Sequence, residues 1–338
     1  MKAIKFFAIS AMAAAMITSC SSEDELSQSN YPSDNIVRVT AGVNNAKTRA
    51  EGAGTEMKNN FSLTIVNKNA PKYTYTDKVF SKSSGDWACS ETLLWQNDKT
   101  PVDIVAFAPA QTGKFNGVYA NGSIQPITYS VASDQSTDQS TSSVNNDLLY
   151  YYTKGFNPGT SLDDKGKLSI QFNHAFCMID INVTLGTEFN KPKVLDDSPI
   201  VKVTLGGTKI AANVDVTNAA SVVTASETDA ATDITTTKGS FDKAANAEAN
   251  AISRFSCIAI PQTVAANTFK VSLMTAGKRY EWTSDKEITL QSGFRYTLNL
   301  SMGNDVVLLK GGSGSDNGGI TASPWTEGDT GDKPLETD

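Results

Sequence analysis

Short runs of β-branched and aromatic residues recur along most of this chain, and clusters of Gly, Asn, Asp and Ser separate them. Runs punctuated in this way are typical of strands joined by turns. Near the C-terminal end, Tyr296, Leu298 and Leu300 alternate with polar residues, and this period of two places their side chains on one face of a half-buried strand. The sequence therefore predicts an all-β protein. The expected strands cover residues 36–43, 61–66, 102–107, 148–152, 168–185, 200–205, 255–260, 269–274, 279–283 and 294–300.

The length of the chain and its breaks in composition predict two domains. About 300 residues are too many for one ordinary sandwich domain. The turn-rich stretch 157–166 precedes a long strand-like run, so we place an N-terminal β-sandwich domain at residues 36–160 and a C-terminal one at 161–305. Residues 306–338 form a C-terminal linker and tail, because the stretch 310–319 has the Gly- and Ser-rich composition of a flexible linker.

The N-terminus has the features of an export signal. Two lysines precede an Ala-rich apolar run that is too short to span a bilayer comfortably, so residues 1–20 are expected to be a signal peptide. The small residues just before Cys20 resemble a bacterial lipobox, which predicts lipidation of Cys20 and anchoring in a membrane. The alternative is an ordinary signal peptide with an incidental cysteine. The acidic residues 21–25 open a tether over residues 21–35 and resemble a signal for export to the outer surface of the outer membrane.

Charge and cysteine content exclude some classes of partner. The net charge is −7, and loss of Lys2 and Lys5 with the signal peptide brings the mature chain to −9. An acidic chain without a basic cluster is a poor nucleic-acid binder.

The mature cysteines are Cys89, Cys177 and Cys257, an odd number. We expect three buried free thiols, although Cys177 and Cys257 could pair if their strands were neighbours.

The sequence lacks the groups that most enzymes need. His174 is the only histidine and lies in a strand-like run, so we expect it to be buried or at a sheet edge beside a polar neighbour. There is no Cys-x-x-Cys pair, no phosphate-binding Gly-rich loop and no nucleophile-elbow pattern. We therefore predict no catalytic residues, no metal, no cofactor and no enzymatic activity.

Carboxylates and aromatic residues leave two further kinds of site open. The pairs Asp163–Asp164, Asp196–Asp197 and Asp329 with Asp332 lie in turn-like sequence, where solvated loop residues are the default. Such pairs could serve a glycosidase if their spacing allowed it, and Asp163–Asp164 or Asp316 could bind calcium. The aromatic residues are mostly expected in the core, and an exposed pair could stack on sugar rings. These residues are Trp87, Trp95, Tyr150, Tyr151, Tyr152 and Trp282.

Several local motifs occur in a distinctive order. They are Trp87 and Trp95, Val102–Pro109 (VDIVAFAP), Asp147–Leu149, Phe172–Ala175 (FNHA), Ile258–Gln262 (IAIPQ), Gly277–Trp282 (GKRYEW), Gly293–Tyr296 (GFRY) and Ile320–Trp325 (ITASPW). Their order and spacing resemble the fimbrillin family, the subunits of type V pili in gut and oral anaerobes. The resemblance covers nearly all of the mature chain. It implies two tandem transthyretin-like β-sandwich domains and the role of a pilus (fimbrial) structural subunit or pilus-associated adhesin at the cell surface.

The resemblance also implies assembly by donor-strand exchange. In the family, a surface protease cuts the precursor lipoprotein after an arginine, the first strand leaves, and the C-terminal segment of the next subunit replaces it. Here Arg49 would be the cleavage site and Ala50 the new N-terminus. The first strand would be the alternating stretch 36–40. The candidate donor residues are Val306, Val307, Leu308, Leu309, Ile320 and Trp325.

Two alternatives stay open at this stage. Arg49 could be an ordinary exposed loop residue, and the C-terminal strands could complete their own domain. The competing function is a monomeric surface lipoprotein that binds glycans or host ligands. The expected partners are other pilus subunits, the processing protease, the outer membrane through the lipid, and a host or bacterial surface ligand. The cleavage site and C-terminal segment favour a stalk subunit, because an anchor would keep its first strand and lipid.

Overall fold

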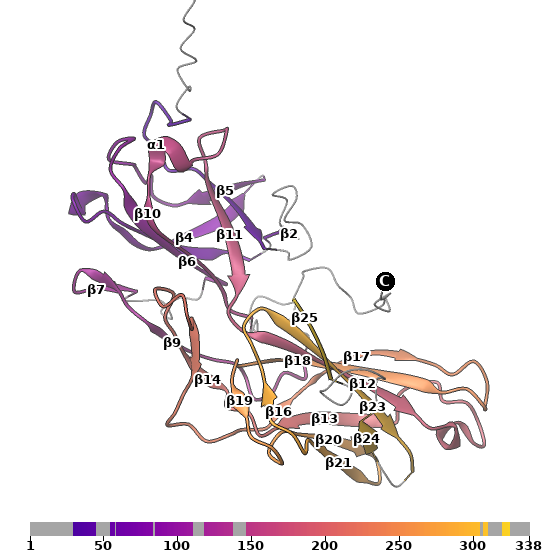
Figure 1. Ribbon diagram of the computed structural model, residues 1–338. Helices are drawn as coiled ribbons and strands as arrows, with labels where there is room; N and C mark the ends of the chain where they lie inside the picture. Colours follow the sequence, from indigo (N-terminus) through magenta and orange to yellow (C-terminus); the bar gives the residue numbers. More distant parts are fainter. Residues whose placement is uncertain are drawn as a thin grey trace, which may run out of the picture.

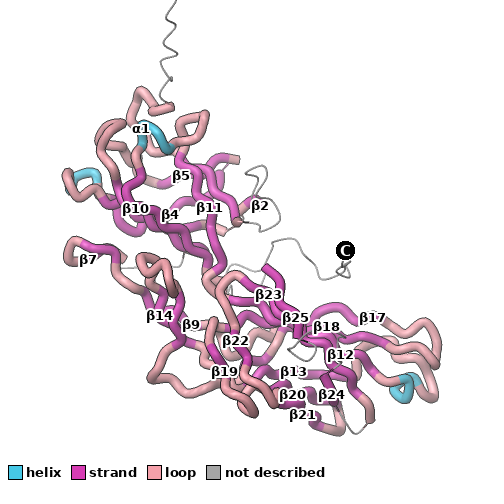
Figure 2. The backbone as a smooth tube through the Cα atoms, viewed as in Figure 1, coloured by secondary structure: helices cyan, strands magenta, loops and turns pink. Residues whose placement is uncertain are grey.

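The computed structural model describes residues 30–44, 55–57, 59–83, 85–110, 118–137, 147–304, 307–309 and 320–324. Strands dominate this part of the chain, and its helices are single turns (Figures 1 and 2). The all-β prediction is confirmed, whereas the transthyretin-like detail stays a prediction. None of the described helices has the length and apolar character needed to cross a membrane. The helical turns are Pro71–Tyr73, α1 (Pro158–Ser161) and Thr187–Asn190.

The first domain is built on one eight-stranded sheet. Its order is β2 (Thr55–Glu56), β1 (Val39–Val43), β11 (Leu168–His174), β10 (Leu149–Phe156), β6 (Val102–Ala108), β3 (Phe61–Val66), β4 (Tyr75–Ser83) and β5 (Asp86–Cys89). The pairs are antiparallel except that β1 runs parallel to β11. The sheet curls, since Cα atoms of β1 and β5 approach within 8 Å. Phe61 lies at the centre of the enclosed core, with ring centroids 5.3 Å from Phe80 and 5.5 Å from Phe172.

The second domain contains the remaining larger sheets. One has the order β17 (Thr237–Asp242), β18 (Ala251–Ala259), β12 (Cys177–Leu185), β23 (Phe294–Met302) and β24 (Val307–Leu309), and β25 (Ile320–Pro324) also pairs with β23. A second has the order β16 (Ile234–Thr235), β13 (Ile200–Gly206), β20 (Lys270–Thr275) and β21 (Arg279–Thr283). A third has the order β15 (Val223–Ala225), β14 (Ala211–Val214) and β9 (Ile127–Ser130). Two short two-stranded sheets are formed by β19 (Thr263–Val264) with β22 (Ile288–Thr289), and by β7 (Tyr119–Ala120) with β8 (Ser123–Ile124).

Strict alternation of apolar and polar residues builds the core of the second domain. Along β12, the odd-numbered side chains from Cys177 to Leu185 are buried and the even-numbered ones are half-buried. Along β23, Tyr296, Leu298 and Leu300 are buried, as their period of two predicts. Since β12 and β23 are adjacent and parallel, their buried faces join into one continuous apolar layer.

The boundary between the domains differs from the predicted one at residues 160 and 161. The predicted strand 168–185 is two strands, of which β11 pairs in the first sheet and β12 in a sheet of the second domain. The core changes accordingly between Phe172, which packs in the first domain, and Ala175, which packs in the second. The turn-rich stretch at 157–166 instead holds α1 and the turn before β11, inside the first domain.

A segment from the first half of the chain also packs in the second domain. Strand β9 pairs with β14, and its buried Ile127 and Tyr129 belong to the second core. On β6, Val105 and Phe107 face this same core, whereas Ile104 and Ala106 face the first. Strand β6 therefore contributes side chains to the cores of both domains. The second domain also contains residues within the range 36–160 that was predicted for the first.

The three mature cysteines are free thiols, as predicted, but only two of them are buried. Cys257 lies opposite Ile179, and Cys177 lies opposite Ala259, so the two cysteines are diagonal neighbours on β18 and β12. Diagonal Cα atoms are about 7–8 Å apart, beyond the usual span of a disulfide of about 4.4–6.8 Å. Cys89 on β5 is half-buried, which corrects the expectation of three buried thiols.

Candidate functional site: strand β1 and the C-terminal strands

Strand β1 is a peripheral strand of the sheet in the first domain. Over its whole length it pairs with β11, from Val39 opposite Leu168 to Val43 opposite Phe172. On its other side, β2 pairs only with Gly42 and Val43, so within the described residues most of that edge has no strand partner. The Val39 and Val43 side chains are 3% exposed, so β1 adds buried apolar surface to the first core.

Polar contacts fix the ends of this strand. The Arg38 guanidinium donates two hydrogen bonds to the Asp34 carboxylate and lowers the pKa of Asp34 to about 2. The Val37 amide donates to the Leu93 carbonyl oxygen at 2.9 Å. At the far end, Asn44 Nδ2 donates to Asn173 Oδ1 at 2.7 Å. The Arg38–Asp34 and Asn44–Asn173 contacts involve exposed groups, so the burial of β1 contributes more to its attachment than these two contacts do.

The strand beside β1 in the sheet, β11, carries apolar side chains that face the first core. The Leu168, Ile170 and Phe172 side chains on β11 are fully buried and belong to the first core, together with Val39 and Val43. Removal of β1 would leave the backbone edge of β11 unpaired and part of this core in contact with water. An exposed strand edge beside an apolar surface is the arrangement to which an added strand binds.

The C-terminal strands lie on one edge of the second domain. Strand β24 pairs with Leu300–Met302, and β25 pairs with Phe294–Leu298, both antiparallel to β23 (Figure 1). Among the predicted donor residues, Val307 and Ile320 are buried in the second core, and Leu308 and Leu309 lie in β24. In this structure the C-terminal strands therefore complete their own domain, which is one of the two alternatives that the sequence left open.

Strand β25 is attached mainly through its backbone. Ile320 is buried, but Thr321, Ala322 and Pro324 are exposed. Backbone pairing with β23 thus supplies most of the contact, and few side chains add to it. Such a strand has a low free energy of local opening compared with a strand in the centre of the sheet.

The remaining predicted site residues fall outside the described part of the chain. These are the lipidation site Cys20, the cleavage pair Arg49 and Ala50, and the donor residues Val306 and Trp325. Strand β1 ends six residues before Arg49, and β2 begins five residues after Ala50. The predicted cleavage site therefore lies in the connection between a peripheral strand and the rest of its domain.

The residues considered for catalysis or metal binding are engaged in other contacts. His174 is buried as predicted, and its Nδ1 lies 2.9 Å from Asp147 Oδ2. Asp196 forms ion pairs with Lys193 and Lys243, which lower its pKa to about 2. Asp163 Oδ1 accepts hydrogen bonds from two backbone amides of its own turn. Within the described ranges no three His, Cys, Asp or Glu side chains cluster as metal ligands.

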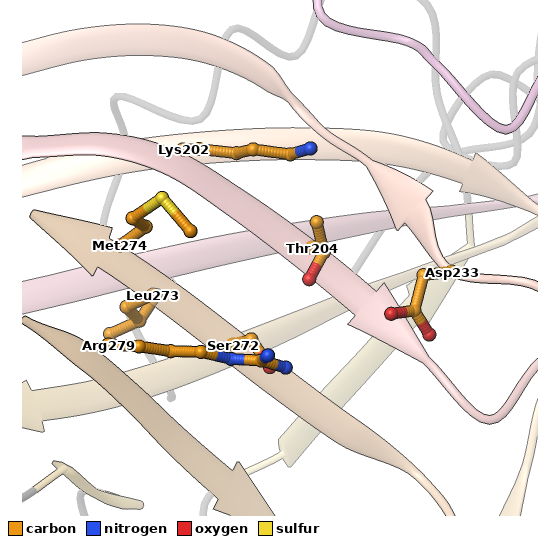
Figure 3. Close-up of a pocket in the computed structure, with 7 residues that line it drawn as sticks. All are labelled: Lys202, Thr204, Asp233, Ser272, Leu273, Met274 and Arg279. Carbon is orange, nitrogen blue, oxygen red and sulfur yellow. The ribbon is translucent and has the colours of Figure 1, made fainter.

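A small depression over β13, β20 and β21 is lined mostly by polar residues (Figure 3). It has a volume of about 170 Å³, with Lys202 and Asp233 at its sides. Arg279 Nη2 donates to Ser272 Oγ at 3.0 Å, and Ser272 Oγ donates to Glu281 Oε2 at 2.9 Å. Two of its polar side chains, Ser272 and Arg279, are therefore engaged in contacts within the protein.

A larger cavity of about 590 Å³ lies beside β25, and sequence reasoning did not identify it. Its lining comes from β21, β22, β23, β25 and the loop between β21 and β22. The sequence signal for it was Trp282, one of two aromatic residues that alternate with polar ones in β21. The cavity depends on the meeting of segments that are distant in the sequence.

Comparisons with known proteins agree with this architecture. The sequence profile of the fimbrillin-like family matches residues 48–325. A comparison with curated proteins gave no match. A proposed cell adhesion protein of Bacteroides ovatus is similar in structure with a TM-score of 0.58 and 15% identity, covering 85% of this chain and 95% of that one.

Two further solved structures show the same likeness. A proposed cell adhesion protein of Bacteroides uniformis has a TM-score of 0.54 and 15% identity, covering 87% of this chain and 100% of the other. A fimbrial protein of Bacteroides vulgatus has a TM-score of 0.52 and 15% identity, covering 86% and 99%. At such identities the likeness establishes a common fold. Since the family profile spans most of the sequence, the chain belongs to the fimbrillin-like family.

Proposed function

We propose that this chain is a structural subunit of a cell-surface fimbria, that it assembles with other subunits by exchanging β-strands, and that it supports adhesion. Its membership of the fimbrillin-like family supports the subunit role. The observation that carries the assembly mechanism is the placement of the first and the last described strands. These are β1 on the first domain and β25 on the second, and each is paired mainly along one side.

The acceptor site in this proposal is the place that β1 occupies. Cleavage after Arg49 would cut the covalent link between β1 and β2, and β1 would then be held only by noncovalent contacts. Burial of a valine side chain contributes about 1.5–3 kcal/mol, and Val37, Val39 and Val43 are the buried valines of this segment. A strand of comparable apolar content from a neighbouring subunit could replace β1 at little net cost.

The donor in this proposal is the C-terminal segment of the neighbouring subunit. Burial of three or four apolar side chains in the acceptor groove would contribute roughly 5–10 kcal/mol before ordering costs. Val307 and Ile320 are the described candidates, because both are apolar and both lie on strands at the sheet edge. Backbone pairing with β11 would add to this burial, so that the polymer would dissociate slowly.

The remaining steps concern export and processing. Lipidation of Cys20 would hold the precursor on the outer membrane until a surface protease cuts after Arg49. The subunit itself would have no catalytic role. The monomeric ligand-binding lipoprotein is the competing function, and it requires that residues 20–49 remain attached.

The test uses the chain from residue 21 onward and an arginine-specific protease. The wild type should be cut after Arg49 and should form ladders of oligomers that resist detergent, while Arg49→Ala should stay monomeric. Arg38→Ala is the matched control, since it removes the nearby arginine that pairs with Asp34, and it should assemble like the wild type. Assembly of Arg49→Ala, or a wild type that is cut at Arg49 and stays monomeric, would contradict the mechanism.

A further inference from the structure

The cavity beside β25 has the size of a ligand-binding groove. Its volume of about 590 Å³ lies within the range of about 300–1,000 Å³ that is usual for small-molecule sites. Trp282, Ile288, Tyr296 and Ile320 form its apolar part, and three of these four side chains are buried. Trp282 is only half-buried, so a ligand in the groove can reach its ring.

The aromatic walls are held in place by their neighbours. The Trp282 ring meets Phe269 edge-on, with ring centroids 6.4 Å apart and an interplanar angle of 79°. The Tyr296 hydroxyl donates to the Thr289 carbonyl oxygen at 3.1 Å and accepts a hydrogen bond from the Gln291 amide at 2.9 Å. Because both rings are fixed, a ligand that stacks on Trp282 would not have to order it first.

The rim of the groove is polar and is shaped by a tight turn. The buried Ser284 hydroxyl donates to the Lys286 carbonyl oxygen at 2.9 Å and accepts from the Lys286 amide at 3.2 Å. This turn exposes Asp285, Lys286 and Glu287, whose side chains line the cavity. Two carboxylates and one ammonium group thus border an apolar floor that contains an accessible indole ring.

We propose that this groove is a binding site for a neutral oligosaccharide. A sugar ring has an apolar face that can stack on the Trp282 indole, and its hydroxyl groups can donate to the Asp285 and Glu287 carboxylates. Polyanionic ligands are disfavoured, because two of the three charged rim residues are acidic and the chain carries a net charge of −7.

The site depends on the C-terminal strand. Ile320 and Ala322 of β25 form part of the lining, so the groove is complete only while β25 lies on its own domain. If strand exchange removes β25, the assembled subunit has an altered groove. This coupling rests on the proposed function, whereas sugar binding by the monomer does not.

The test is an array of neutral oligosaccharides probed with the uncleaved monomer from residue 21 onward. We expect at least one glycan to bind, and titration calorimetry with that glycan should show that Trp282→Ala weakens the affinity at least tenfold. The double variant Asp285→Asn, Glu287→Gln should weaken it at least threefold. The matched control is Glu227→Gln, Asp229→Asn, which changes two exposed acids of another loop and should bind like the wild type.

Three results would overturn the proposal. They are a wild type that binds no neutral glycan on the array, groove variants that bind as well as the wild type, and a groove that takes up an extended peptide in place of a sugar. Circular dichroism checks that Trp282→Ala is folded. If that variant unfolds, the exposed double variant decides the outcome. Because every measurement uses the monomer, failure of subunit assembly would not affect this test.

Discussion

At the scale of single residues, the side chain of Gln135 hydrogen-bonds the backbone of Ile258 near the end of β18, as a neighbouring strand would. Its Oε1 accepts from the Ile258 amide at 2.8 Å, and its Nε2 donates to the Ile258 carbonyl oxygen at 2.9 Å. The side chain is fully buried, so it satisfies a buried backbone unit in the way that a neighbouring strand would. One residue from the first half of the sequence is thereby tied into the second domain.

The Gln135→Ala variant should therefore be less stable. It leaves the buried amide and carbonyl of Ile258 without this partner, and we expect the free energy of unfolding to fall by about 2–4 kcal/mol. Urea denaturation measures the change. Gln291→Ala, at an exposed position, is the control and should change stability by less than about 0.5 kcal/mol. Equal stabilities of the two variants would contradict the role assigned to Gln135.

The buried cysteines should be chemically inert in the folded protein. Burial raises the pKa of the Cys177 thiol to about 12, and it also raises the pKa of Cys257. A thiol reagent at pH 8 should therefore modify Cys89 alone in the chain from residue 21 onward, and all three thiols after unfolding. Prompt native modification of Cys177 or Cys257 would contradict their burial.

At the scale of secondary-structure elements, the division of residues 168–185 into two strands has a signal in the sequence. The buried side chains of β11 are even-numbered, at Leu168, Ile170 and Phe172, whereas those of β12 are odd-numbered from Cys177 onward. This change of phase means that one straight strand could not bury both sets on the same face. Attention to phase, in addition to β propensity, would have located the domain boundary.

Other parts of the architecture have no local signal. Strand β9 joins the second domain because its Ile127 and Tyr129 find an apolar surface there, and the sequence nearby does not specify which domain that surface belongs to. The same limit applies to the site. The resemblance to the fimbrillin family implied the roles of the first strand and the C-terminal segment, but the groove at Trp282 arises only when β25 packs beside a distant loop.

The peripheral position of β25 predicts how fast its amides exchange with solvent. We expect peptides that cover residues 320–324 to exchange at least roughly tenfold faster than peptides from β12, because among the described residues β25 pairs with β23 alone and buries Ile320 alone. Hydrogen–deuterium exchange with mass spectrometry measures both. Equal protection of the two strands would argue against β25 as a releasable donor.

At the scale of the whole molecule, β6 contributes side chains to the cores of both domains, β1 lies next to the edge strand β2 of its sheet, and β25 pairs with β23 near the edge of another. The first domain depends on a strand that precedes the predicted cleavage site. The second domain carries its last strand on an outer edge. In the proposed assembly, such a chain would release the first strand and offer the last one to a neighbouring subunit.

In the proposed assembly, processing at Arg49 is coupled to exchange of these strands. Intact mass and N-terminal sequencing of the protein sheared from the native cell surface test this coupling. We expect chains that begin at Ala50 and occur in heat-resistant oligomers. Monomeric chains that still begin at a lipidated Cys20 would contradict it and would favour an anchored, ligand-binding lipoprotein.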